Sequence, residues 1–188
     1  MSIAVLVAGC APRLDDSAAD SADSAMSRPD VTRPRDQPPP SPEPVLITAD
    51  SNAYRLRRAA DAFEVDMVAT FTNQTADTVY LPPCGRNQPA FMLEKWVSGE
   101  WRPAYSPPCP AILMLDPPRV APGTSRTDTA RVRASLSPNT MPRFEIQPVS
   151  GVYRLVYTQA YGSWRPNLGP GELLPLERRV SRIFRIEE

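Results

Sequence analysis

Hydrophobic and polar side chains alternate with a period of two along much of the chain after residue 45. The clearest case is residues 63–71, Phe-Glu-Val-Asp-Met-Val-Ala-Thr-Phe, in which every second residue is apolar. Such alternation places the apolar side chains on one face of a β-strand, whereas a helix would bring Asp66 and Thr70 onto the same stripe as Phe63. We therefore predict a strand here, with one face in the core of the protein.

Further short apolar runs follow, separated by turn-forming residues. Residues 91–97 and 100–105 are joined by Ser98 and Gly99, a two-residue connection typical of a tight β-hairpin. The other predicted strands are residues 78–81, 111–115, 127–133, 143–147, 151–157 and 178–186. Only residues 57–62 favour a helix, of about one turn. Short strands at this spacing, without amphipathic helices between them, predict an all-β, antiparallel sandwich.

The start of a late strand narrows the fold class. Gly151-Val152-Tyr153 resembles the tyrosine corner of immunoglobulin-like sandwiches, in which a tyrosine hydroxyl bonds to the backbone a few residues upstream. Leu155 stands where an antibody domain has its core cysteine, so the resemblance is to the broad immunoglobulin-like class. Trp96 and Trp101 flank the Ser98-Gly99 turn, and we expect one of them to be the core tryptophan between the sheets.

The N-terminal residues 2–8 form an uncharged, apolar run that ends at Gly9 and Cys10. A membrane-spanning helix needs about 20 apolar residues, so this run is too short to span a bilayer. The tetrapeptide Val7-Ala8-Gly9-Cys10 resembles a bacterial lipobox. This resemblance implies that residues 1–9 belong to a truncated signal peptide, and that Cys10 carries the lipid and becomes the mature N-terminus. The alternative is an apolar tail with an incidental cysteine.

The residue after the lipid-bearing cysteine bears on location. Ala11 stands there in place of aspartate, and in this respect the chain resembles lipoproteins sorted to the outer membrane. We therefore expect a lipid-anchored protein of the bacterial cell envelope, at the outer membrane and facing the periplasm. Its contact with the membrane would be made through the N-terminal lipid.

Residues 10–44 are rich in proline, aspartate, serine and alanine, and contain few large aliphatic side chains. Such a segment cannot bury enough apolar area to offset the entropy of ordering it. We predict a disordered, lipid-anchored tether, with residues 37–44 stiffened in the polyproline II conformation. One domain, residues 45–188, follows it.

Composition excludes several function classes. The chain has no histidine, which removes Ser-His-Asp and Cys-His catalysis and imidazole metal sites. Its 21 basic and 21 acidic residues give a formal net charge of 0, which argues against a nucleic-acid partner. Carboxylates such as Glu94, Glu100 and Asp116 have no positioned base or nucleophile beside them in the sequence. We predict a protein that is not an enzyme, with no metal ion and no small-molecule cofactor.

Cysteine usage predicts one disulfide. With Cys10 assigned to the lipid, Cys84 and Cys109 remain as a pair, and each follows two prolines in a loop setting. An exported protein with two remaining cysteines favours a disulfide between them. The alternative is a redox-active or metal-binding thiol pair, against which stand the absence of a Cys-x-x-Cys spacing and of histidine.

A loop rich in aromatic and turn-forming residues is the candidate partner-binding site. Residues 161–172 contain Tyr161, Trp164 and Arg165, and tryptophan, tyrosine and arginine dominate the energetics of protein interfaces. Loops at one end of a sandwich are where such domains bind partners. The alternative is that Trp164 covers the end of the core.

Together with the lipobox, these features resemble the small bacterial lipoproteins that carry one immunoglobulin-like domain. The Thr-Val-Tyr-Leu-Pro-Pro-Cys and Gly-x-Tyr-Arg-Leu motifs carry this resemblance. A more distant similarity is to the immunoglobulin-like intracellular proteinase inhibitor domain of bacteria. The first resemblance implies a binding or structural domain with an envelope protein as partner, and the second implies a protease inhibitor.

Overall fold

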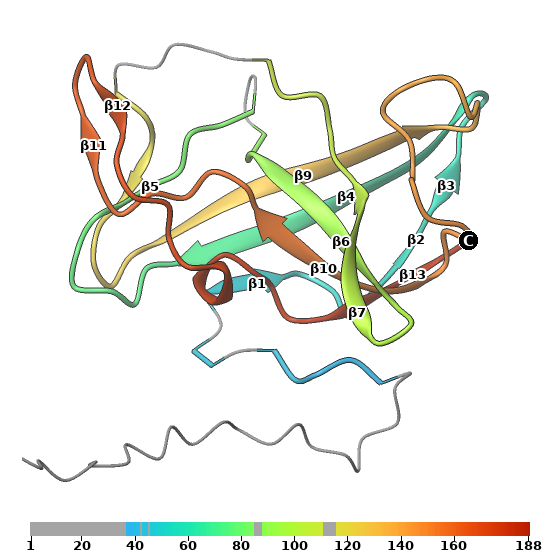
Figure 1. Ribbon diagram of the computed structural model, residues 1–188, viewed down its shortest axis with the longest axis horizontal. Coiled ribbons are helices and arrows are strands. Elements are labelled where there is room, and N and C mark those ends of the chain that lie inside the picture. Colours follow the sequence, from blue (N-terminus) through green and yellow to red (C-terminus); the bar gives the residue numbers. More distant parts are fainter. Residues whose placement is uncertain (1–36, 42, 45, 85–87, 111–115) are drawn as a thin grey trace, which may run out of the picture. The chain divides into compact units, whose positions relative to one another are not determined.

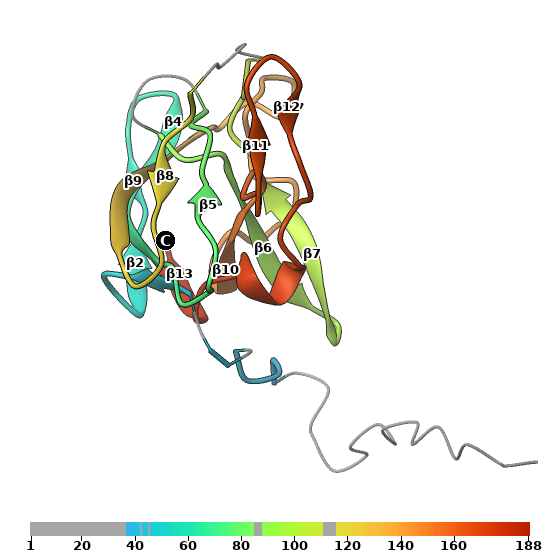
Figure 2. The same ribbon diagram turned by 90° about the vertical axis from the view of Figure 1, so that its left-hand side faces the viewer.

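Two β-sheets face each other in the computed structural model, which describes residues 37–41, 43–44, 46–84, 88–110 and 116–188. All of the strands belong to one unit, residues 34–188. Figure 2 shows β4 and β9 on one side of this unit, and β6, β7 and β10 on the other. The predicted signal peptide, Cys10 and most of the predicted tether lie outside the described residues.

The first sheet is built around its longest strands. Its strands are β1 (Ile47–Ala49), β3 (Arg57–Arg58), β4 (Ala62–Thr72) and β9 (Ser125–Ser135). β4 pairs antiparallel with β9 along its whole length, from Ala62 opposite Ser135 to Thr72 opposite Ser125. On its other side β4 pairs with β1 and β3.

The second sheet has five strands. In spatial order they are β2 (Ala53–Arg55), β13 (Phe184–Glu187), β10 (Gly151–Tyr157), β6 (Phe91–Val97) and β7 (Glu100–Tyr105). The strands pair antiparallel except for β2, which runs parallel to β13. The order β7-β6-β10-β13 is that of strands C′, C, F and G of a variable-type immunoglobulin sheet, and β4 and β9 pair as strands B and E.

Two short strand pairs and one 3₁₀ turn lie outside the two sheets in the described part of the chain. β5 (Val79–Tyr80) pairs with β8 (Arg119–Val120), and β11 (Trp164–Arg165) pairs with β12 (Gly169–Pro170). A single 3₁₀ turn, η1 (Leu176–Arg178), precedes the last strand (Figure 1).

The core lies between the inner faces of the two sheets, as the alternation predicts. On β4 the side chains of Val65, Met67 and Phe71 are at most 6% exposed, while Asp66 between them is exposed. On β10 the inward side chains are Tyr153, Leu155 and Tyr157. Phe63, at the start of β4, is only half-buried, because the strand there lies at the edge of the core.

The tyrosine corner is present. The hydroxyl of Tyr153, at the start of β10, donates a hydrogen bond to the carbonyl of Val149, four residues upstream. This bond has the position that immunoglobulin-like sandwiches use at the start of strand F. The predicted fold class, an antiparallel immunoglobulin-like β-sandwich, is thereby confirmed.

The predicted bounds of the β6–β7 hairpin are also confirmed. Residues 91–97 and 100–105 form β6 and β7, and Ser98 and Gly99 connect them with φ angles of 52° and 89°. Positive φ at both central residues defines the turn whose twist matches that of the flanking strands. Glycine adopts such a φ without a steric penalty.

Three secondary-structure predictions are wrong, and one lies outside the described residues. Residues 143–147 form no strand, since Pro142 and Pro148 on either side lack the N–H that a ladder requires, although Phe144 between them is buried. The expected helix at 57–62 is β3 and the turn into β4, because Arg57 and Arg58 pair with β4. The last strand begins only at Phe184, not at residue 178. The predicted strand 111–115 is not among the described residues.

The expectation of a core tryptophan is wrong as well. Neither Trp96 nor Trp101 belongs to the core; they are cross-strand partners on the outer face of the second sheet, with ring centroids 5.2 Å apart. The turn at Ser98-Gly99 fixes this register, in which the neighbouring Lys95 is the side chain that is buried, at 6% exposure. Aromatic rings on β7 and β10 fill the core instead, among them Tyr105 and Tyr153.

Candidate functional site

A β-hairpin leaves the end of β10 and returns toward β13. We call residues 160–174 the 160–174 hairpin. Its stem is held by hydrogen bonds from the amide of Leu174 to the carbonyl of Ala160 at 2.8 Å, and from Gly162 to Glu172 at 3.0 Å. β11 and β12 continue the pairing, and Figures 1 and 2 show them as a separate two-stranded arm beside β5. The hairpin therefore replaces the simple loop predicted for this segment.

The base of the hairpin is fixed to the sandwich by backbone and side-chain bonds. The amide of Tyr157 donates to the carbonyl of Arg179 at 2.8 Å, and the Arg179 guanidinium donates to the carbonyls of Tyr157 at 2.8 Å and Leu174 at 2.7 Å. Tyr80 of β5 and Tyr161 exchange two backbone hydrogen bonds, of 2.9 and 3.0 Å. Burial lowers the pKa of Arg179, since its guanidinium is partly removed from water.

The structure brings two of the three predicted site residues together. The rings of Tyr161 and Trp164 meet edge to face with centroids 6.2 Å apart, and both side chains are half-buried. Arg165, the next residue, is exposed. Trp164 is not among the buried core side chains, and its half-burial is compatible both with partner binding and with the alternative of covering the end of the core. Its buried indole N–H has no hydrogen-bond partner among the described residues.

The tip of the hairpin carries an exposed aliphatic side chain that sequence reasoning missed. Leu168 is 77% exposed, the largest value among the exposed large hydrophobic side chains of the described residues. It follows Asn167, whose φ of 66° turns the chain between β11 and β12. Asn167 and Gly169 are turn-forming residues, and turns usually carry polar side chains. The leucine between them is therefore the sequence feature that could have indicated an exposed apolar side chain.

The outer face of the second sheet carries a buried ion pair. Glu94 of β6 and Arg154 of β10 approach to 2.6 Å, with side chains 10% and 14% exposed. The Arg154 guanidinium also lies over the Trp101 ring, 4.6 Å from its centroid. Glu100 is in an ion pair with Arg102. Two of the three carboxylates singled out from the sequence are thus neutralised by arginine, and the third, Asp116, is exposed.

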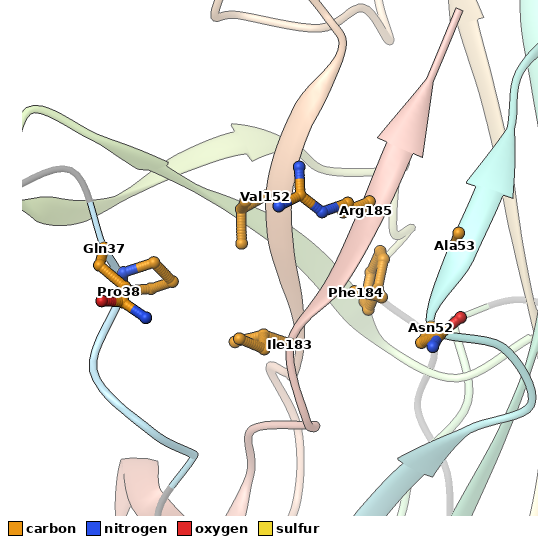
Figure 3. Close-up of a pocket in the computed structure, with 8 residues that line it drawn as sticks. All are labelled: Gln37, Pro38, Asn52, Ala53, Val152, Ile183, Phe184 and Arg185. Carbon is orange, nitrogen blue, oxygen red and sulfur yellow. The ribbon is translucent and has the colours of Figure 1, made fainter.

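A groove opens on the outer face of the second sheet, across β2, β13 and β10 (Figure 3). Its volume is about 380 Å³, at the lower end of the range of ligand sites. Its floor is formed by Val152 of β10 with Ile183 and Phe184, while Gln37 and Pro38 lie on one side. Asn52 and Ala53 lie on the other side, and Arg185 completes the lining. We call this the β10–β13 groove.

Cys84 and Cys109 form a disulfide, as predicted. Their Cα atoms are 5.0 Å apart. The two residues lie before β6 and after β7, so the bond closes the chain around the β6–β7 hairpin. The thiol-pair alternative requires reduced cysteines, whereas here both sulfurs are in the disulfide.

Two kinds of buried titratable group lie in the interior. Burial raises the pKa of four tyrosines: Tyr54, Tyr105, Tyr153 and Tyr157. Lys95, the only lysine of the chain, donates a hydrogen bond to the carbonyl of Pro148, with its ammonium 5.7 Å from the centroid of the Tyr153 ring. Burial lowers the pKa of Lys95, and the charge of Glu188 opposes this shift.

No group of three or more acidic or cysteine side chains within the described part of the chain has the arrangement of a metal site. In the same part of the chain, no helix is both long enough and apolar enough to cross a membrane. Comparisons with protein-family models, with curated proteins and with solved structures found no match to this chain.

Proposed function

We propose that this chain is a lipid-anchored protein of the bacterial cell envelope whose sandwich is a binding domain without catalytic activity. The observation that carries the binding role is the 160–174 hairpin, which presents Trp164, Arg165 and Leu168 from a base bonded to the sandwich. Aromatic and arginine side chains on a rigid support lose little entropy on binding and dominate interface energetics. The partner proposed is another protein of the envelope.

The membrane anchor rests on the sequence at Cys10. Two or more acyl chains hold a protein stably at a bilayer, because each buried methylene contributes about 0.8 kcal/mol. Intact mass of the protein purified from its host membranes tests this part. A chain that begins at Cys10 and carries acyl mass supports the anchor, and an unprocessed chain without added mass rejects it.

The binding role is tested with a paired Trp164→Ala, Leu168→Ser variant. Wild type, this variant and a Met141→Ser control are each crosslinked to an envelope extract, and the captured proteins are compared by mass spectrometry. Met141 is a suitable control since it is apolar and 65% exposed but lies outside the hairpin. A partner lost only by the hairpin variant supports the proposal, whereas the same partners on all three proteins reject it.

Protease inhibition is the second candidate, and it draws on the same hairpin. Arg165 is exposed on the short strand β11, and serine proteases with an acidic specificity pocket accept an extended segment that carries a basic side chain. The test is a panel of serine proteases assayed with micromolar amounts of the full chain. Undiminished activity of all of them rejects this candidate and leaves the binding role in place.

A further inference from the structure

The two cysteines of the disulfide have different surroundings. Cys84 is 6% exposed, and its amide donates a hydrogen bond to the carbonyl of Gln88 at 2.7 Å. The Gln88 side chain in turn donates to the carbonyl of Arg131 on β9 at 3.3 Å. Cys109 is exposed, and within the described part of the chain its backbone forms no hydrogen bond. One half of the disulfide is therefore buried and fixed, and the other half is open to water.

This difference decides which sulfur a thiolate can attack. In thiol–disulfide exchange the attacking sulfur forms a bond to one cysteine while the other cysteine leaves as a thiolate. The attacked sulfur has to be reachable from solvent. Burial shields the Sγ atom of Cys84 from a molecule as large as a tripeptide while the domain is folded, whereas the exposed Cys109 can be approached.

The surroundings of Cys84 suit a sulfur that leaves and then returns. Its Sγ atom lies 3.4 Å from the carbonyl oxygen of Pro108. Once the bond to Cys109 is broken, the Cys84 thiolate takes a proton from water, and the new S–H can donate to this oxygen. The Cα atoms of the two cysteines are 5.0 Å apart, so the Cys84 thiol stays beside Cys109 and can restore the bond.

Both segments that carry the cysteines are also held by contacts other than the disulfide. At the end of β7 the Tyr105 ring lies in the core, and its hydroxyl donates to the carbonyl of Arg133 at 3.3 Å and accepts from its amide at 3.1 Å. Before Cys84, the amide of the buried Leu81 donates to the carbonyl of Pro118 at 2.8 Å. We therefore expect the domain to stay folded when the disulfide opens.

We propose that the Cys84–Cys109 disulfide is a thiol-exchange site, at which the thiolate of a low-molecular-weight thiol attacks Sγ of Cys109 and Cys84 is the leaving sulfur. The electron pair of the broken S–S bond goes to the Cys84 sulfur, and a mixed disulfide forms on Cys109. Attack of the Cys84 thiolate on Sγ of Cys109 then expels the small thiol and restores the original bond. Each step exchanges one S–S bond for another, so no further oxidant or reductant is needed.

This site is separate from the 160–174 hairpin. Failure of the exchange would leave the proposed binding role unaffected, and the reverse also holds.

The first test maps the mixed disulfide. The full chain with Cys10→Ser, in which Cys84 and Cys109 are the only cysteines, is mixed with millimolar reduced glutathione and quenched with acid at early times. Free thiols are blocked with N-ethylmaleimide, and peptides are identified by mass spectrometry. Trypsin separates the two cysteines, because Arg86 and Lys95 lie between them in the sequence. We expect glutathione on Cys109 and N-ethylmaleimide on Cys84, at least about tenfold more often than the reverse.

The second test is a matched pair of variants, Cys84→Ser and Cys109→Ser, each in the Cys10→Ser chain. Both lack the disulfide, so its loss is common to the pair, and they differ in which thiol remains. The rate of reaction with glutathione disulfide is expected to be at least about tenfold higher for Cys84→Ser, since its remaining thiol is the exposed one. Urea denaturation verifies that both variants are folded, and in the unfolded chains the two rates should converge.

Three results would overturn the proposal. The first is glutathione found on Cys84 as often as on Cys109. The second is a disulfide that glutathione opens in the urea-unfolded chain but leaves intact in the folded chain. The third is an equal reaction rate for the two folded single-cysteine variants.

Discussion

Two tyrosines of β10 have the same burial and opposite hydrogen-bonding states. Tyr153 is 0% exposed and its hydroxyl donates to the Val149 carbonyl. Tyr157 is 1% exposed and its hydroxyl has no hydrogen-bond partner among the described residues. The same substitution, tyrosine to phenylalanine, therefore removes a satisfied donor at one position and an unsatisfied hydroxyl at the other.

The two variants are expected to change stability in opposite directions. Tyr153→Phe leaves the buried Val149 carbonyl without this donor, which costs about 1 to 3 kcal/mol of unfolding free energy. Tyr157→Phe removes a buried hydroxyl whose dehydration is not repaid by a hydrogen bond, so the free energy of unfolding stays the same or rises by about 1 kcal/mol. Both variants keep the ring, and with it the packing of the core.

Urea denaturation followed by tryptophan fluorescence measures the difference. An unchanged dependence of free energy on urea indicates that the variants differ in stability alone. For a chain of this size, each kcal/mol also corresponds to about 2 to 4 °C in Tm. If Tyr157→Phe is destabilised as much as Tyr153→Phe, the Tyr157 hydroxyl is hydrogen-bonded in solution and the reasoning is refuted.

Two further predictions concern the disulfide and alkaline pH. Replacing Cys84 and Cys109, which are 25 residues apart, with alanine should lower the free energy of unfolding by about 3 kcal/mol in urea denaturation, and unchanged stability would contradict this. Raising the pH above about 10 should lower the Tm, because the unfolded chain loses tyrosine protons that the four buried tyrosines retain, each contributing up to about 1.4 kcal/mol per pH unit. Lys95, with its lowered pKa, contributes in the opposite direction up to its ordinary value of 10.5. A constant Tm across this range would argue against the burial of the tyrosines.

Local patterns were sufficient where one strand or one turn decides the structure. The bounds of β6, β7 and β10 follow from alternation and from turn residues at their ends. The tyrosine corner was also predictable, because Tyr153 needs only its own strand and the residue four positions before it. In these segments neighbouring residues carry enough information.

Prediction failed where the outcome depends on contacts between distant segments. The positions of Trp96 and Trp101 depend on which face of the second sheet each residue of the β6–β7 hairpin occupies, and the sequence suits either face. The 160–174 hairpin contains proline and glycine, which indicate a loop. A Cβ atom at Gly171 would lie 2.0 Å from the Ser163 hydroxyl, so a larger residue there would force the Ser163 side chain to turn away. That close approach exists only after the two halves of the hairpin have paired.

The burial of Lys95 determines how the protein responds to chemical modification. The only side-chain amine of the chain is in the interior, bonded to the Pro148 carbonyl, and every other basic side chain is a guanidinium. Reagents that acylate amines therefore find no accessible lysine on the folded domain, and conjugation is directed to the N-terminal amine. Attachment to dyes or solid supports would leave both the 160–174 hairpin and the β10–β13 groove unmodified.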